Sequence, residues 1–183
     1  WEWGPYLGEE AKITGVNMMV SSFTRLHPNI NMTKSKAAGN YVNSLLVKTL
    51  ALRSGYEEAV ILDANGFVAE CTGENLFMVR RGVIYTPPLS TVLEGITRDS
   101  ILTLAADLGI STREAMITRD QLYIADEVFI SGTAAEIVGV RAIDTRQIGE
   151  GKPGAITRAL SEAFTAAIRG ESRRSAEWLD FVQ

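Results

Sequence analysis

Histidine and cysteine are nearly missing from this sequence, which has one of each among 183 residues. Cys71 has no partner for a disulfide within the chain, which fits a reducing compartment. Because the sequence carries no targeting signal, we expect a cytoplasmic protein. A hydrolytic triad would need a nucleophile held beside His27. No nucleophile-elbow motif occurs, so His27 is interpreted as an ordinary loop residue. Cys, His and carboxylate residues do not cluster at metal-ligand spacing, and we expect no metal site.

Strong charge and long apolar runs are also missing. The net charge is −4, whereas a nucleic-acid surface favours a basic patch, so no nucleic-acid partner is expected. No apolar run reaches the roughly 18 residues of a membrane span. Residues 1–10 lack the basic start and apolar centre of a signal peptide, so no membrane association is expected. The motif GxxxxGK[ST] is absent, which excludes a nucleotide P-loop.

The residues that are present have the balance of a globular domain, with 46% hydrophobic and 22% charged side chains. Asn65-Gly66 and Arg81-Gly82 are typical of the turns of two hairpins. Because strands come in runs and hairpins with helices between some of them, we predict a mixed α/β (α+β) domain with a curved, largely antiparallel sheet and flanking helices. Apolar and β-branched runs predict strands at residues 13–23, 57–63, 67–71, 75–80, 83–87, 127–132 and 138–144.

Helical patterns fill gaps between these strands. Asn40 is expected to cap a helix that begins at Tyr41 and ends before Gly55. Further helices are predicted at residues 95–109, at 118–126 and from Pro153 onward. The side chains expected to face the core are, helix by helix, Val42, Leu45, Leu46, Thr49 and Leu50; Ile101, Leu104, Ala105 and Leu108; and Ile156, Leu160, Ala163, Phe164 and Ala167.

Lys36 is the first candidate for chemistry. It follows a polar loop and precedes Ala-Ala-Gly, small residues that let a flat ligand approach the backbone. A lysine becomes a nucleophile when it is desolvated and its pKa falls. Most lysines near helix starts are solvated, so Lys36 alone does not identify a catalytic site.

A carboxylate and two anion-compatible turns strengthen the case. Glu70 lies in an apolar strand, where a charge is costly without a positive partner. Gly95 precedes a helix whose first N–H groups are free, with the Thr97 hydroxyl beside them, and residues 131–136 form another small-residue turn after a strand. Pyridoxal phosphate needs an amine, an acid near its ring nitrogen and donors for its phosphate. The combination predicts a pyridoxal 5'-phosphate site, although each piece alone could be a buried salt bridge, a helix cap or a hairpin turn.

Longer motifs resemble a known family. Residues 70–77 (ECTGENLF), 84–86 (IYT) and 93–98 (LEGITR) are similar, in residue type and spacing, to the signature of the class IV, fold-type IV pyridoxal-phosphate aminotransferases. Within that class, residues 36–41 (KAAGNY) and 131–137 (SGTAAEI) most resemble the branched-chain amino acid aminotransferases.

The resemblance implies a role for each matching position. Lys36 is expected to bond to the cofactor's aldehyde and to move the substrate's α-proton, with Lys34 a bystander. The backbone of Thr133 and Ala134 is expected to receive the substrate carboxylate. The other expected cofactor contacts are Tyr41 at the phenolic oxygen, Glu70 at the pyridine nitrogen, Leu93 against the ring, and Ile96, Thr97 and Thr133 at the phosphate.

The resemblance also implies an activity, which is transamination between branched-chain L-amino acids and 2-oxoglutarate with pyridoxal 5'-phosphate as cofactor. Other class IV activities stay open: a D-amino acid aminotransferase, an amine transaminase or 4-amino-4-deoxychorismate lyase. A catalytically incompetent, isolated cofactor-binding domain is a second alternative. A non-enzymatic binding module that keeps the scaffold is a third.

The resemblance further implies the curved pseudo-barrel of a fold-type IV large domain and places the chain within a longer protein. Residues 1–8 are interpreted as an interdomain connector and residues 9–183 as the cofactor-binding large domain. A smaller N-terminal domain, which completes the substrate site in this family, has no counterpart in the sequence, so we expect a part upstream of Trp1. The expected partners are amino acid and 2-oxo acid substrates and further subunits, as a homodimer or higher homo-oligomer.

Overall fold

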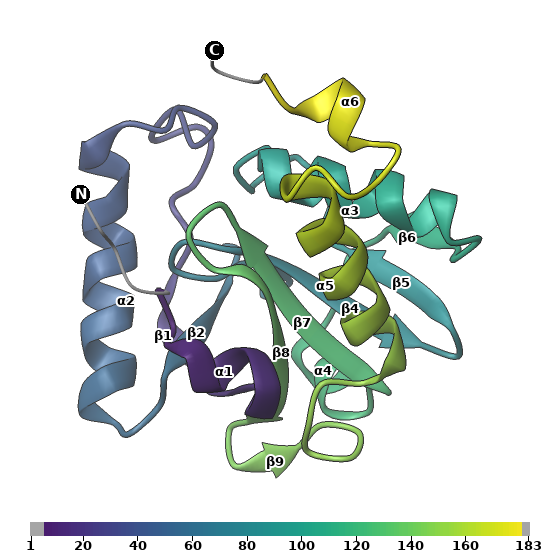
Figure 1. Cartoon of the computed structure of the whole chain (residues 1–183). Helices are drawn as coiled ribbons and strands as arrows, with labels where there is room; N and C mark the ends of the chain where they lie inside the picture. The colour runs from purple at the N-terminus through teal and green to yellow at the C-terminus, as the bar shows by residue number, and fades with distance from the viewer. Residues whose placement is uncertain (1–5, 181–183) are drawn as a thin grey trace.

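The computed structural model of the chain describes residues 6–180 and is organised around one curved sheet (Figure 1). Within these residues the sheet has nine strands in the spatial order β3-β2-β1-β8-β7-β4-β5-β6, with β9 paired to β8. The strands are β1 (Val16–Thr24), β2 (Glu58–Leu62), β3 (Val68–Glu70), β4 (Asn75–Arg80), β5 (Val83–Thr86), β6 (Thr112–Glu114), β7 (Glu127–Gly132), β8 (Glu136–Ile143) and β9 (Arg146–Gln147).

Antiparallel pairing dominates the described sheet, with five of its eight strand pairs antiparallel. The parallel pairs are β1–β2, β1–β8 and β5–β6. Parallel neighbours need a long crossover, and the segment between β1 and β2 provides one that contains a helix. The predicted mixed α/β fold with a curved, largely antiparallel sheet is confirmed.

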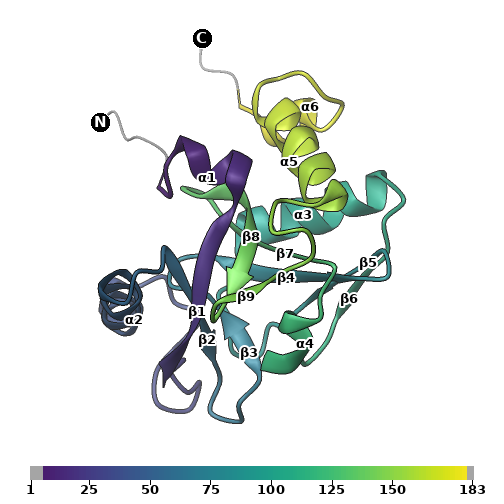
Figure 2. The ribbon, with the colours of Figure 1, turned by 90° about the horizontal axis from the view of Figure 1, so that it is seen from below.

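The helices cover different parts of the sheet. Helix α2 packs against β1 and β2, whereas α3 and α5 pack against each other and against β7, well away from α2 in Figure 2. Among the described helices, none combines the length and apolarity that a membrane crossing requires. The helices are α1 (Glu9–Thr14), the 3-10 turn η1 (Ala38–Asn40), α2 (Tyr41–Arg53), α3 (Ile96–Asp107), α4 (Arg119–Tyr123), α5 (Ala155–Ile168) and α6 (Ser175–Trp178).

The side chains of strand β4 alternate between the two faces of the sheet and so contribute to two layers of the core. Leu76 and Met78 join a cluster that includes Leu122 of α4, while Phe77 belongs to a cluster with α3 and α5. The rings of Phe77 and Phe129 stack with centroids 4.7 Å apart. Because successive side chains of a strand point to opposite faces, β4 contributes to both layers.

Helix α2 begins at Tyr41 as predicted, but the prediction of its inward face is wrong. Val47 and Ala51 face the sheet instead, where they pack on Ala59 and Ile61 of β2. Small side chains allow the helix axis to approach the strand closely, and two apolar stripes on one helix cannot be ranked without knowing the partner surface. The predicted set was Val42, Leu45 and Leu46, which are 58%, 66% and 50% exposed, and Thr49 and Leu50, which are half-buried.

The start of the chain also differs from expectation. The strand predicted from residue 13 begins at Val16, because residues 9–14 form α1 and Gly15 turns the backbone with φ 78°. The carbonyl oxygen of Gly139 lies 2.9 Å from where a Cβ on Gly15 would be, so a side chain would not fit there. Of the expected connector at residues 1–8, residues 1–5 lie outside the described part of the chain.

The remaining helices follow the predictions except at their ends. Leu108 was expected in the core but follows the end of α3 and is exposed. Helix α5 begins at Ala155, two residues after Pro153, and its predicted inward side chains pack in the core. The short elements α1, β6, β9 and α6 were not predicted, because each depends on contacts with distant segments rather than on its own pattern.

Candidate active site

A cavity of about 260 Å³ lies among the loop before α2, the turn between β3 and β4, the start of α3 and the end of β7. Ala134, which was also predicted at the site, follows Thr133 in the same turn and does not line the cavity. The other predicted site residues all line it: Lys36, Tyr41, Glu70, Leu93, Ile96, Thr97 and Thr133. Four separate segments therefore bring an amine, a phenol, an acid and two turns to one place.

The two lysines of the loop have different surroundings. Lys34 forms an ion pair with Glu94, whereas Lys36 has no ion pair within the described residues. Both side chains are exposed. The burial that would make Lys36 nucleophilic is therefore not supplied by residues 6–180 alone.

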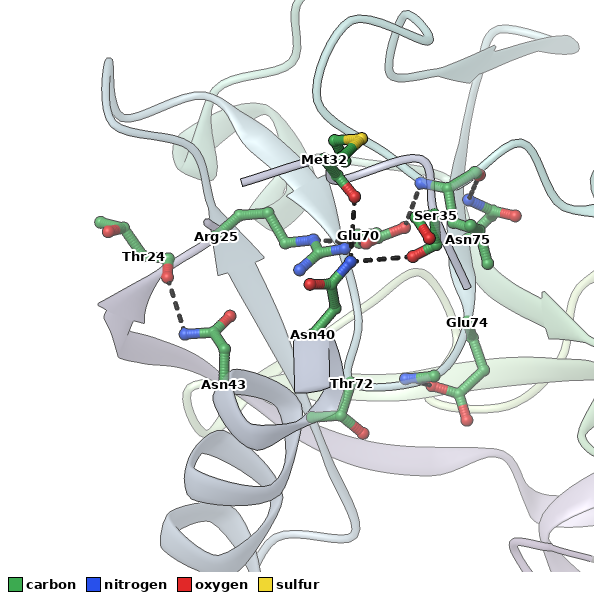
Figure 3. A network of polar contacts seen from close by, with 12 residues as sticks. Thr24, Arg25, Met32, Ser35, Asn40, Asn43, Glu70, Thr72, Glu74 and Asn75 are labelled. Carbon is green, nitrogen blue, oxygen red and sulfur yellow. Dashed lines mark hydrogen bonds and ion pairs between the residues drawn. The ribbon is translucent and has the colours of Figure 1, made fainter. Parts of the chain in front are cut away.

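Asn40 holds the loop that carries Lys36. It was expected to cap α2, but its side chain makes no cap hydrogen bond, because η1 already gives it helical dihedral angles. Its Nδ2 instead donates to the carbonyl oxygens of Met32 at 3.0 Å and Ser35 at 2.8 Å (Figure 3). Asn40 thus fixes the backbone just before Lys36.

Glu70 is buried against a positive partner that the sequence did not reveal. Figure 3 shows Arg25, which follows β1, pointing toward Glu70, and its Nε lies 2.5 Å from Oε1 of the carboxylate. The other oxygen accepts the N–H of Leu93 at 3.0 Å. Burial raises the pKa of Glu70, while the Arg25 charge and the Leu93 N–H oppose that rise. Arg25 is the only cation that forms an ion pair with Glu70 among the described residues.

The turn before α3 is built around a glycine. Asn75 donates through Nδ2 to the carbonyl of Leu93 at 3.0 Å. A Cβ on Gly95 would lie 2.2 Å from Oδ1 of Asn75, so only glycine fits. The N–H groups of the first turn of α3, including Ile96 and Thr97, have no partner within the helix and can receive an anion. Sequence reasoning missed Asn75, because its partner lies in a different turn.

The second turn follows β7. The hydroxyl of Ser131 lines the cavity, is buried and has no hydrogen-bond partner among the described residues. Thr133 is exposed beside it. Glu136 takes up the left-handed conformation with φ 56° at the end of the turn, where the Lys12 ammonium contacts it at 3.0 Å. An unpartnered buried hydroxyl is costly, so the Ser131 hydroxyl is available to donate to an anion in the cavity. Its position inside an apolar strand gave no sequence signal.

These groups suit a flat, anionic molecule with a ring nitrogen. The acid Glu70 lies on one wall, and the turns at Gly95 and Thr133 both line the same cavity. Backbone N–H groups at a helix start and at a strand end are common anion sites.

Comparison with known proteins agrees with this geometry. Residues 1–143 match the family described as amino-transferase class IV. A branched-chain-amino-acid aminotransferase of Pseudomonas aeruginosa is 48% identical over 183 residues, which is 100% of this chain and 60% of the relative. One of Escherichia coli strain K12 is 51% identical over 181 residues, or 98% of this chain and 59% of the relative.

Solved structures give the same relationship. The branched-chain amino acid aminotransferase of Escherichia coli has a TM-score of 0.97 at 50% identity, over 100% of this chain and 60% of that chain. The T.th. branched-chain amino acid aminotransferase complexed with N-(5'-phosphopyridoxyl)-L-glutamate has a TM-score of 0.94 at 45% identity, over 100% and 59%. The chain thus spans about 60% of the length of these relatives.

The family match covers most of the sequence and the whole cavity wall, which extends from Arg25 to Thr133. The resemblance seen in the motifs at residues 70–77 and 93–98 is confirmed by it. This chain belongs to the class IV aminotransferases.

Proposed function

We propose that this chain is the cofactor-binding part of a pyridoxal 5'-phosphate-dependent aminotransferase that acts on branched-chain L-amino acids and 2-oxoglutarate. The observation that carries the proposal is the meeting of Lys36, Glu70 and the turns at Gly95 and Thr133 around one cavity. Relatives about 50% identical to this chain are named for the same activity. One similar structure contains N-(5'-phosphopyridoxyl)-L-glutamate, a cofactor joined to an amino acid.

The residues present fit this cofactor. The buried, unpartnered Ser131 hydroxyl and the glycine-only turn at Gly95 leave donors for a phosphate. We assign the phosphate to the N–H groups of Ile96 and Thr97, the Thr97 hydroxyl and Thr133, with Ser131 as a further donor. Tyr41 is assigned to the phenolic oxygen, Glu70 to the ring nitrogen and Leu93 to the ring face.

The bound cofactor withdraws electrons from the substrate's Cα and so makes the proton on that carbon acidic. In the proposal, the Lys36 amine holds the aldehyde until substrate arrives, then removes the Cα proton and returns it on the cofactor side. Glu70 keeps a proton at the ring nitrogen, and Arg25 favours the charged form of Glu70 that this requires. The backbone of Thr133 and Ala134 orients the substrate carboxylate.

The proposal extends to the organisation of the whole protein. Residues 9–183 are the large domain, residues 1–8 are the connector, and a smaller domain completes the substrate pocket. A homodimer is part of the proposal and is supported by the exposed apolar face of α2, whose first residue, Tyr41, lines the cavity. A cytoplasmic location is consistent with Cys71, a buried free thiol.

The test is reconstitution of the full-length protein with the cofactor, followed by a substrate panel. We expect a visible absorption band from the bond to Lys36, loss of that band in Lys36→Ala, and its retention in Lys34→Ala. L-Leucine and L-valine should be consumed with 2-oxoglutarate. Turnover of D-alanine instead, or release of pyruvate by elimination, would assign the chain to another class IV activity. A band that persists in Lys36→Ala would refute the lysine assignment.

A further inference from the structure

A buried cluster of charges beside the cavity has no part in the proposed reaction. It consists of Lys48 on α2, Glu58 on β2 and Glu74, which immediately precedes β4. Glu58 is fully buried, Glu74 is 3% exposed, and Glu74 lines the cavity. Buried charges are costly unless their surroundings compensate them, so the contacts of each carboxyl group matter.

Glu58 links three parts of the chain. Its carboxylate accepts hydrogen bonds from Lys48 Nζ at 2.6 Å and from the Thr72 hydroxyl at 2.9 Å. Its other oxygen accepts the N–H of Ala59 at 2.8 Å. Lys48 also donates to the carbonyl of Glu57 at 2.8 Å. Glu58 therefore ties α2 and the turn at residues 71–74 to β2, and both of its oxygens have donors.

Glu74 lacks such donors. Its Oε2 accepts the N–H of Gly73 at 3.1 Å, and its Oε1 has no hydrogen-bond partner among the described residues. Burial, and next the nearby Glu58 charge, raise the pKa of Glu74 to about 8. Burial and the Glu58 charge therefore both favour the neutral form of Glu74. The charged and titratable groups that act on it or feel its charge are Glu58, Lys48, Glu70, Tyr6 and Cys71.

The turn at residues 71–74 touches several parts of the candidate site. Glu70 directly precedes it, and Asn75, which holds Leu93, directly follows it. The Gly73 carbonyl oxygen and the Glu74 Cγ lie 3.1 and 3.5 Å from the position of a Cβ on Gly132, next to the turn after β7. A shift of residues 71–74 would therefore displace the acid and both anion-binding turns together.

We propose that Lys48, Glu58 and Glu74 are positioning residues, which hold the turn at residues 71–74 in the shape that binds the cofactor, and that this shape requires Glu74 to be neutral. A second negative charge next to Glu58 would be buried with one oxygen lacking a donor among the described residues. The turn must then open to let water reach it, and ligand affinity falls. The inference rests on the proposed function, because it concerns the same cavity.

The test uses the full-length protein freed of cofactor and pyridoxine 5'-phosphate as ligand. This ligand has the ring and the phosphate but an alcohol in place of the aldehyde, so it forms no covalent bond to Lys36. The dissociation constant is measured by calorimetry from mildly acidic to alkaline pH. Above a midpoint set by Glu74, affinity should fall by up to about tenfold per pH unit.

Two variants should move this midpoint in opposite directions. Glu58→Gln removes the charge that raises the Glu74 pKa, so the midpoint moves to lower pH by about one unit. Lys48→Met removes a charge that lowers the Glu74 pKa, so the midpoint moves to higher pH. Glu74→Gln is always neutral and should lose the midpoint. Lys152→Met, in an exposed ion pair with Glu150, is the matched control and should leave it unchanged.

General damage to the fold would not move the pH midpoints of Glu58→Gln and Lys48→Met in opposite directions. Any other result for these midpoints therefore counts against the inference. The inference is overturned if the two midpoints coincide with that of the unaltered protein or move the same way. It is also overturned if Glu74→Gln keeps the alkaline loss of affinity, and this variant decides alone if Glu58→Gln or Lys48→Met does not fold. Failure of the folded, unaltered protein to bind the ligand at any pH overturns the proposed function and the inference together. Binding without opposite shifts overturns only the inference.

Discussion

The Arg25 guanidinium lies against the Glu70 carboxylate, with Nε 2.5 Å from Oε1 and both side chains more than nine-tenths buried. Arg25 follows β1 and Glu70 ends β3, so the pair joins segments on either side of β2. The backbone N–H of Arg25 donates to the carbonyl of Leu62 at the end of β2, at 2.8 Å. The proposed acid of the site therefore depends on residues outside its own motif.

Arg25→Met should destabilise the protein strongly at neutral pH. It leaves a buried carboxylate without its cation, which costs about 3–5 kcal/mol of unfolding free energy. The pKa of Glu70 should rise further, so the loss should be smaller in acid, where Glu70 is protonated in both states. Urea denaturation at neutral and acidic pH measures this. Arg80→Met, which breaks an exposed pair with Asp126, should cost at most about 1 kcal/mol, and equal losses would contradict the prediction.

Gly95→Ala should weaken binding of pyridoxine 5'-phosphate. The new methyl group would overlap Oδ1 of Asn75 and push the turn before α3 away from the cavity. Misplaced binding groups cost about tenfold or more in affinity. Gly109→Ala is the control, since its methyl group meets nothing within 4 Å among the described residues and it lies at the opposite end of α3 from the cavity. If calorimetry gives both variants the same affinity, the close packing at Gly95 has no role in binding.

Glu74→Gln should change how stability depends on pH. The pKa of Glu74 rises from 4.5 to about 8 in the folded protein. As pH rises, the unfolded chain therefore loses the carboxyl proton of Glu74 before the folded protein does. The contribution of Glu74 to stability falls as pH rises from 4.5 to about 8. Glu74→Gln has no proton to lose at this position. Between pH 4.5 and about 8, its free energy of unfolding should therefore rise relative to that of the unaltered protein. Parallel curves from denaturation series would exclude the effect, and Glu150→Gln, at an exposed position, should give such parallel curves.

Leu45→Glu should lower the oligomeric state of the full-length protein. Leu45 is 66% exposed on the outer face of α2, and a charge there would oppose burial between two subunits. Light scattering after gel filtration gives the mass. Ile13→Glu on α1, at a residue 77% exposed, is the control. An unchanged mass for Leu45→Glu would show that this face of α2 lies outside the subunit contact.

Local chemistry made some elements predictable. Asn65-Gly66 and Arg81-Gly82 form the expected hairpin turns, with φ 86° at Gly66 and 52° and 76° at Arg81 and Gly82. These conformations depend on neighbouring residues alone, so the sequence pattern suffices. The motifs containing Lys36, Glu70 and Thr97 likewise placed their residues at one cavity.

Contacts between residues far apart in the sequence could not be predicted. Arg25 is one of many arginines and carries no local sign that it pairs with Glu70. The same holds for Lys48 and Glu58, and for Asn75 and Leu93, because each contact depends on how distant segments cross. The inward face of α2 was missed for a related reason: the approach distance to β2, and not apolarity, decides which stripe is buried.

The pairing of β1 with β8, with Val16 opposite Val140, sets the order of events during synthesis. The segments bearing Lys36 and Glu70 leave the ribosome long before β8 exists to cover this edge of β1. Distant parallel pairing forms slowly, and an apolar strand with a free edge invites association with other chains. Until β8 has been synthesised, this edge of β1 therefore has no partner strand and can pair with other chains.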